Sequence, residues 1–301
     1  MHRTEFLVIG GCYAGLSAAL QLARARRDVT VVDAGARRNR FVDAAGETSH
    51  GYLSQDGVAP AVIAANARQQ LLRYPTVRWL DGTAEGARRL DDGRFRFSVA
   101  AQQVEAARVV LALGVRDELP PVPGLAERWG RSIFHCPYCH GYELDAGPIG
   151  IIATSALAQH HAVMLPDWGR PTLFLNGAYQ PSEEELALFK QRGTTVEVTP
   201  VARIDGVADV VLTDGRTVRL NGLFTQPRTH LASPLAEELG CELVDGPMGA
   251  FIKVDSMQQT TVANVFACGD AARAAGNVVL AAADGAMAGI SAHRATMQIA
   301  H

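Results

Sequence analysis

Two cysteines, Cys136 and Cys139, stand two residues apart near the middle of the chain, with a histidine on each side of the pair. A Cys-x-x-Cys pair can close a small disulfide ring and reopen it, which is the core of thiol–disulfide exchange. The reactive form is the thiolate, so a nearby base matters. His140 directly follows the pair, and a histidine can take a proton from a thiol and return it. Glu143 is expected to orient the His140 ring, as carboxylates often do.

Other interpretations of this segment stay open. Cys-x-x-Cys-His literally matches a c-type haem attachment site, but that attachment occurs outside the cytoplasm and no export signal precedes it. A zinc site needs further ligands at readable spacing, which the sequence lacks, so no metal is expected. Cys-Pro-Tyr-Cys also occurs in glutaredoxins, although no thioredoxin-like order of elements surrounds it here. The remaining alternative is a pair of buried, inert thiols beside a structural His140.

The N-terminal segment has the order strand, glycine turn, helix, strand and acid. A continuous apolar run, typical of a buried parallel strand, leads directly into the turn 10–15 (GGCYAG). A helix over 16–27 and a strand over 29–32 are then followed by Asp33. In a dinucleotide-binding fold, such a turn faces a pyrophosphate and the acid accepts from ribose hydroxyls. The second glycine of the fingerprint is replaced by Cys12, which is expected to be a small buried residue.

Two later segments predict the closing elements of the same fold. One apolar strand ends at Gly114, and another ends in Gly269-Asp270. A helix rich in Ala and Gly, from Asn277 to His293, could pack closely on a sheet or a cofactor. The glycine lets a phosphate or a ring approach the backbone, and Asp270 suits an acceptor for a ribityl hydroxyl.

With these motifs in order, the chain resembles the low-molecular-weight thioredoxin reductases, within the flavoproteins that have two dinucleotide-binding domains. The resemblance extends over essentially the whole chain and rests on the glycine turn, the strand ending at Gly114, the cysteine pair and the segment 266–270 (FACGD). It implies an α/β fold of two Rossmann-like domains. A discontinuous FAD domain would comprise 1–116 and 223–301, and the inserted NAD(P)H-type domain with the Cys-x-x-Cys would comprise 117–222.

Carried over residue by residue, the resemblance implies an FAD site made from the glycine turn, the strand ends and the start of the last helix. The residues concerned are Gly10, Gly11, Cys12, Ala14, Gly15, Asp33, Gly114, Gly269, Asp270, Asn277 and Val278. Asn277 and Val278 would lie near the flavin ring. Cys139 would face the flavin, Cys136 would attack the external partner, and His140 takes the place where thioredoxin reductases carry an acid.

The inserted domain departs from the family at its own nucleotide turn. The turn 153–155 (ATS) contains no glycine, and a Cβ at each position obstructs close approach of the backbone to phosphate. The family places basic residues for the 2′-phosphate of NADPH after the next strand, where this chain has the segment 176–179 (NGAY). The sequence therefore predicts weak or absent NAD(P)H binding. An atypical loop that still binds NADH through other backbone amides is the alternative.

In these respects the chain also resembles the dithiol oxidases of gliotoxin and holomycin biosynthesis, which share the scaffold, a Cys-x-x-Cys followed by His, and a degenerate nucleotide turn. The resemblance implies that a small dithiol reduces the pair, the pair reduces FAD, and oxygen reoxidises the flavin. The reverse direction would need another electron partner, such as a ferredoxin-type donor. One alternative is an NAD(P)H-dependent reductase of thioredoxin or a similar disulfide partner, and another is a non-enzymatic redox-sensing flavoprotein. Family members pair as homodimers, so a homodimer is expected.

Length and composition agree with this reading. A chain of 301 residues suggests about two domains, and 48% hydrophobic residues suffice for ordinary cores. A net charge of -3 and a pI near 6.3 argue against a nucleic-acid partner. Five cysteines in this length do not indicate a disulfide-stapled secreted domain, and Cys241 and Cys268 are expected to be buried thiols. No apolar run of about 18 residues predicts a membrane span, so the expected location is the cytoplasm.

Overall fold

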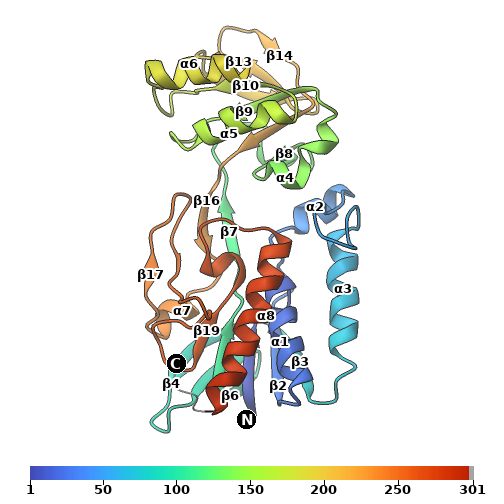
Figure 1. Ribbon diagram of the computed structural model, residues 1–301, viewed down its shortest axis with the longest axis vertical. Coiled ribbons are helices and arrows are strands. Elements are labelled where there is room, and N and C mark those ends of the chain that lie inside the picture. The colour runs from blue at the N-terminus through green and yellow to red at the C-terminus, as the bar shows by residue number, and fades with distance from the viewer. Residues whose placement is uncertain (298–301) are drawn as a thin grey trace. The chain divides into compact units, whose positions relative to one another are not determined.

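The computed structural model describes residues 1–297 and divides the chain into two compact units (Figure 1). Unit 1 comprises Met1–Arg40, Pro60–Arg116 and the chain from Thr229 onward. Unit 2 comprises Phe41–Ala59 and Asp117–Arg228. Each unit has a mainly parallel sheet with helices packed on it, which is the α/β architecture expected from the sequence.

The sheet of unit 1 is parallel along the edge where the glycine turn lies. Its path is β3 (Val77–Asp81), β2 (Val29–Asp33), β1 (His2–Ile9), β6 (Gln102–Leu111), β5 (Phe95–Val99) and β4 (Ala84–Arg89), and β19 (Val265–Ala267) also pairs with β6. The first half of β6 pairs antiparallel with β5, and its second half pairs parallel with β19. The strands β3, β2, β1, β6 and β19 therefore end at one edge, which is where α/β proteins place their ligands.

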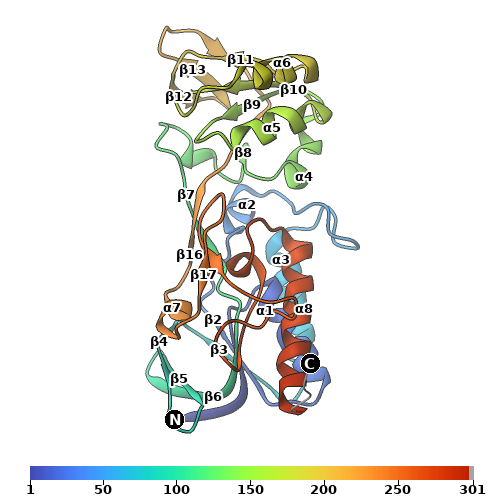
Figure 2. The same cartoon turned by 60° about the vertical axis from the view of Figure 1, so that its left-hand side comes forward.

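Two helices, α1 (Tyr13–Arg24) and α8 (Val278–Arg294), lie side by side in unit 1 (Figures 1 and 2). A Cβ at Gly285 of α8 would collide with the carbonyl oxygen of Ala14, so glycine is what allows the two backbones to touch. The helix predicted over 16–27 begins and ends three residues earlier. Its last turn is closed because Arg26 adopts a left-handed conformation with φ of 61°.

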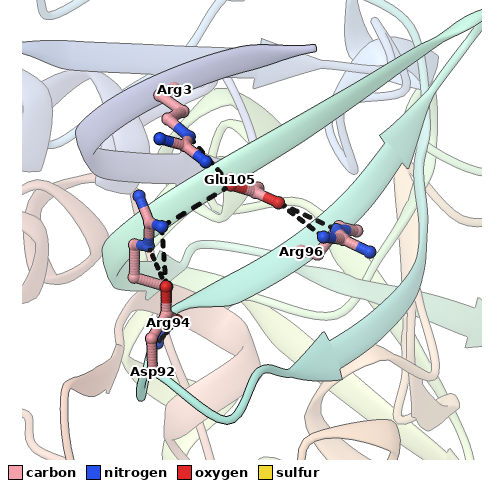
Figure 3. Close-up of polar contacts among 5 residues, drawn as sticks. All are labelled: Arg3, Asp92, Arg94, Arg96 and Glu105. Carbon is pink, nitrogen blue, oxygen red and sulfur yellow. Dashed lines mark hydrogen bonds and ion pairs between the residues drawn. The ribbon is translucent and has the colours of Figure 1, made fainter.

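A buried carboxylate ties the antiparallel corner of unit 1 together (Figure 3). The side chain of Glu105 on β6 is only 2% exposed. Its two oxygens accept from Arg3 Nε at 3.1 Å and from Arg96 Nη2 at 2.7 Å, so both bonds are charge-assisted. These arginines hold the pKa of Glu105 below its usual value, and the cluster links β1, β5 and β6.

Unit 2 contains a five-stranded sheet in the order β11 (Thr195–Glu197), β10 (Arg170–Phe174), β9 (Pro148–Ile152), β15 (Gly222–Thr225) and β8 (Ile133–Phe134). Every neighbouring pair in this sheet is parallel. Apolar side chains form one cluster with the helices α5 (Ala158–Met164) and α6 (Glu183–Arg192) and a second cluster with the three-stranded sheet β12 (Val201–Asp205), β13 (Asp209–Leu212) and β14 (Thr217–Val218). The helix predicted to start in the acidic run begins at Glu183, after a capping box between Ser182 and Glu185.

The remaining elements are short or connect the larger ones. They are α2 (Arg40–Ala45), α3 (Pro60–Leu71), α4 (Pro137–His140), α7 (Leu235–Glu238), β7 (Val115–Glu118), β16 (Arg228–Leu231), β17 (Leu243–Val244) and β18 (Phe251–Ile252). The strands β7 and β16 pair with each other where the chain passes from one unit to the other. Within residues 1–297, no helix combines the length and the apolar character needed to cross a membrane.

The compact units differ from the predicted domain boundaries at two places. Strand β15 pairs with β8 and β9, so unit 2 extends to Arg228 and not to residue 222. The reason is that β15 is fully buried and completes the sheet of unit 2. In addition, Phe41–Ala59 belongs to unit 2, where Phe41 packs so closely on Gly130 that a Cβ there would lie 2.8 Å from the Cβ of Phe41. The sequence has no periodic signal in this segment, and only the contacts reveal its assignment.

Candidate active site

The two cysteines of the Cys-x-x-Cys motif form a disulfide at the carboxyl end of β8. Cys136 is the N-cap of α4 in an extended conformation, and Pro137 occupies the first helical position. A proline there is pre-organised for a helix and lacks only an N–H that would have no partner in the helix anyway. One turn of helix brings Cys139 back, with a Cα–Cα distance of 5.3 Å to Cys136. Both residues are half-buried, so the bond is reachable from the surface of unit 2.

The ring of His140 stacks on Phe134, with centroids 4.2 Å apart and planes 15° apart. Burial is the main cause that lowers the pKa of His140 to about 4, and the neighbouring His50 adds to it. The pKa of His140 therefore lies well below the ordinary value of a histidine. At neutral pH the ring is uncharged, so one of its two nitrogens can accept a proton.

His50 is the residue of this site that sequence reasoning missed. It lies in Phe41–Ala59, and its ring meets that of His140 edge to face, with centroids 6.4 Å apart. Its Nδ1 lies 3.3 Å from Oε1 of Glu143. The prediction that Glu143 orients His140 is wrong, because the carboxylate pairs with His50. No spacing signal connects residue 50 with residue 140. The only signal in the sequence is a lone histidine in a Gly-rich segment.

Two aromatic side chains border the disulfide. Tyr138, between the two cysteines, is 71% exposed and meets the ring of Trp168 edge to face at 5.1 Å. His135, just before Cys136, stacks on Trp129 at 5.9 Å. The ring of His161, which is only 3% exposed, hydrogen-bonds to the backbone of His135. The motif therefore sits on an aromatic base and presents one exposed ring beside the sulfur atoms.

In unit 1 the glycine turn has the geometry of a dinucleotide fingerprint. Gly10 follows β1 with φ of 110°, and a Cβ at Gly15 would collide with the carbonyl oxygen of Gly10. These two glycines therefore let α1 start directly against the end of the strand. Cys12 is the N-cap of α1, and among the described residues it makes no side-chain capping bond. Burial raises the pKa of the Cys12 thiol to about 12, so it is a small neutral group.

The acids predicted for cofactor binding lie around this turn. Asp33 at the end of β2 accepts from the backbone N–H of Gly11 at 3.3 Å and of Gly35 at 3.1 Å, both on Oδ1, so neither bond uses Oδ2. A Cβ at Gly269 would lie 2.9 Å from that of Ala14, which puts the Gly269-Asp270 turn on the first turn of α1. Asp270 is paired with Arg38 at 2.9 Å.

The last three predicted cofactor residues have structural roles that are visible. Gly114 has φ of 68°, and its carbonyl oxygen accepts from Ala232. Asn277 caps α8, since its Oδ1 accepts from Leu280 N at 2.9 Å, and Val278 is the first residue of that helix. The residues of unit 1 fit a dinucleotide: a strand, a glycine turn, an uncapped helix start and an acid with an unused oxygen meet in one place.

The corresponding turn of unit 2 is closed by its own side chains. Thr154 donates its hydroxyl hydrogen to the carbonyl oxygen of Gln226 at 2.9 Å, which ties the turn to the end of β15. Ser155 Oγ accepts from Leu157 N at 3.3 Å, and α5 begins only at Ala158. After β10, Asn176 is used inside the unit, accepting from Val201 N at 2.9 Å. No arginine or lysine occurs between Arg170 and Lys190.

Residues 4–288 match the family of pyridine nucleotide-disulphide oxidoreductases. The chain belongs to this family. It is 36% identical to thioredoxin reductase tcpT of Claviceps purpurea over 95% of this chain and 92% of that protein. It is 32% identical to thioredoxin reductase sirT of Leptosphaeria maculans, over 95% and 92%.

Solved structures agree with the family assignment. An oxidoreductase from Agrobacterium tumefaciens has 53% identity and a TM-score of 0.94, with 98% of this chain and 99% of that chain covered. The structure of HlmI has 33% identity and a TM-score of 0.87, covering 98% and 92%. This pyridine nucleotide-disulphide oxidoreductase is therefore an enzyme of the thioredoxin reductase-like type. Thioredoxin reductases of the family are FAD-dependent, and the turn of unit 1 fits that cofactor.

Proposed function

We propose that the protein is an FAD-dependent thiol–disulfide oxidoreductase that oxidises small dithiols and passes their electrons to oxygen. The observation that carries this proposal is the nucleotide turn of unit 2. Its Thr154 hydroxyl is hydrogen-bonded to the carbonyl oxygen of Gln226, and no arginine or lysine follows β10 before Lys190. An NADPH site needs the opposite, namely a glycine turn open to the pyrophosphate and a cation for the 2′-phosphate.

The half-reaction at the cysteine pair follows from the groups present. A substrate thiol gives its proton to neutral His140, and the resulting thiolate attacks Cys136, so that Cys139 leaves as a thiolate. The imidazolium formed at His140 stabilises that thiolate by its charge. The second substrate thiol then loses its proton and attacks the mixed disulfide. The products are the oxidised substrate disulfide and two cysteine thiolates, so two electrons and two protons have been transferred.

The cofactor would be held by unit 1. The glycine turn 10–15 and the start of α1 would take its pyrophosphate, and Asp33 would accept from a ribose hydroxyl. Asp270 is the corresponding acceptor for the ribityl chain. FAD, when bound, supplies a two-electron acceptor for the reduced cysteine pair. The homodimer stays a prediction of the family resemblance, and the cytoplasmic location stays a prediction from the sequence.

A second candidate is an NAD(P)H-dependent reductase of a thioredoxin-like protein. The relatives from Claviceps purpurea and Leptosphaeria maculans are named thioredoxin reductases, which favours it. The two candidates use the same disulfide and differ in the electron donor. A third alternative is a redox sensor without turnover. The Cys139→Ser variant separates it from the two enzymes, because the substitution removes thiol–disulfide exchange and with it any turnover of a model dithiol.

The experiment is an anaerobic titration of the flavin-loaded protein, followed by its absorbance band. Dithiothreitol is expected to bleach the flavin of the wild type but not of Cys139→Ser. NADPH and NADH are expected to leave it oxidised on a timescale of seconds, and air should then restore the band with consumption of oxygen. Rapid stoichiometric bleaching by either nicotinamide would overturn the proposal and establish the reductase.

A further inference from the structure

Three side chains near the disulfide form a connected series of a hydroxyl, an imidazole and a carboxylate. Thr48 Oγ1 lies 3.0 Å from Nε2 of His50, and Nδ1 of His50 lies 3.3 Å from Glu143 Oε1. A carboxylate can only accept, so in the neutral ring Nδ1 carries the hydrogen and Nε2 is the acceptor. Nε2 of His50 is therefore a proton-accepting nitrogen that holds a hydrogen bond from the Thr48 hydroxyl, which can turn to accept when the ring is protonated there. The carboxylate on the Nδ1 side stabilises the ring once it is charged.

The series of Thr48, His50 and Glu143 lies next to His140 and leads from it toward solvent. The rings of His50 and His140 meet edge to face at 6.4 Å, a separation that one bridging water can span between ring nitrogens. Exposure rises along the series, because the side chain of His50 is 21% exposed, that of Glu143 is 40% exposed and that of Asp56 is 71% exposed. Asp56 also lies 3.7 Å from Nδ1 of His50. Both of these acidic partners are more exposed than His50 itself.

The stoichiometry of a dithiol creates a need for such a group. Oxidation of two thiols releases two protons, and each must leave its sulfur before that sulfur can attack. His140 accepts one proton and is then charged. A neutral imidazole has only one basic nitrogen, so His140 cannot hold two of these protons. Its ring stacks on Phe134, and among the described residues it has no carboxylate partner that could take the first proton onward. A second acceptor has to act before the mixed disulfide can resolve.

We propose that His50, backed by Glu143, is the second proton acceptor of the dithiol half-reaction. The first substrate thiol transfers its proton to His140 and forms a mixed disulfide with Cys136. The second thiol loses its proton toward His50, directly or through His140, and its sulfur attacks the substrate sulfur of the mixed disulfide. The Cys136 sulfur leaves as a thiolate, and the proton passes to Glu143 and to water. The inference rests on the proposed dithiol chemistry and adds a residue to it.

The test uses the flavin-loaded protein with dithiothreitol, without oxygen. His50→Asn keeps a donor toward Glu143 but cannot carry a proton. Each reaction is quenched with acid, and mass spectrometry measures the adduct of dithiothreitol on Cys136. His160→Asn is the matched control, since that histidine is exposed on α5 of the same unit. Glu143→Gln, at a side chain that is 40% exposed, is the second variant.

In His50→Asn we expect the mixed disulfide to accumulate and the rate of flavin reduction to fall by about tenfold or more near neutral pH. The deficit should shrink toward about pH 9, where thiols ionise without a base. Glu143→Gln should show the same pattern more weakly, and His160→Asn should match the wild type. Equal loss at every pH without the adduct, or no loss, would overturn the inference. A wild type that dithiothreitol does not reduce would instead remove the proposed function.

Discussion

His140 lies face to face with Phe134, with ring centroids 4.2 Å apart, so the base of the redox site is held against the apolar core of its own unit. This contact explains why the pKa of His140 is about 4, since burial disfavours the charged ring. The site therefore keeps a base that stays unprotonated well below neutral pH. In the proposed reaction, the negative charge of a Cys139 thiolate would offset the weak basicity of this ring.

Removing the stacked ring should change the pH dependence of the reaction. In Phe134→Ala, water reaches His140, and its pKa should rise from about 4 toward 6.5. A protonated ring cannot accept a proton, so activity is lost as the pH falls through that pKa. The rate of flavin reduction by a dithiol, taken relative to the wild type, should fall between about pH 7 and pH 5. Phe189→Ala removes another buried ring of unit 2 and should leave this ratio independent of pH.

The three cysteines outside the disulfide should be inert in the native protein. Burial raises the pKa of Cys12 to about 12 and also raises those of Cys241 and Cys268. Alkylation needs the thiolate, so iodoacetamide at neutral pH should add no label to the oxidised protein. After reduction with a dithiol, mass spectrometry should find two labels, both within the Cys136–Cys139 peptide. A label on Cys12 of the oxidised protein would contradict the assigned burial.

The contact between α1 and α8 should not tolerate a side chain. Gly285→Ala places a methyl group against the carbonyl oxygen of Ala14 and should cost about 1–3 kcal/mol of unfolding free energy. Because Ala14 lies in the first turn of α1, FAD affinity should fall as well. Thermal melting and flavin binding measure the two effects. Ala283→Ser, on the exposed side of the same helix, is the control and should change neither quantity. If Gly285→Ala left both the melting temperature and the flavin affinity unchanged, the two helices could separate at little cost.

The free energy of unfolding should decrease as the pH falls below neutrality. The pKa of His161, which is 3% exposed, is lowered to about 4 by burial. Between about 6.5 and 4 the unfolded chain binds a proton that the folded chain does not, so the stabilisation is complete above that window and is lost through it. The loss is of the order of 3 kcal/mol for this residue. Denaturant melts of His161→Gln across this range should show a smaller slope; an unchanged slope would assign the effect to other groups.

Much of the fold was predictable because its signals are local. The run before the glycine turn, the acid at the end of β2 and the segment 266–270 each combine a buried strand with a turn that only a few residue types allow. The Cys-x-x-Cys pair and His140 were predictable for the same reason, since the three residues that carry the chemistry lie within the short segment 136–140.

The remaining parts of the site depend on distant contacts. His50 meets His140 across a separation of ninety positions along the chain, and no period or spacing encodes that approach. Strand β15 looked like the return of the FAD domain, and only its pairing with β9 assigns it to unit 2. The low pKa of His140 could not be predicted, because the sequence does not show that Phe134 stacks on the ring.

The assignment of Phe41–Ala59 to unit 2 affects how this protein can be recombined with its relatives. The chain passes between the units four times, after residues 40, 59, 116 and 228. A chimera made by exchanging only the long insert would transfer the disulfide and His140 from one parent and keep residue 50 from the other. Grafts that respect the contacts must therefore move two separate stretches of the gene, and coevolution between them is expected to exceed that within either unit's surface loops.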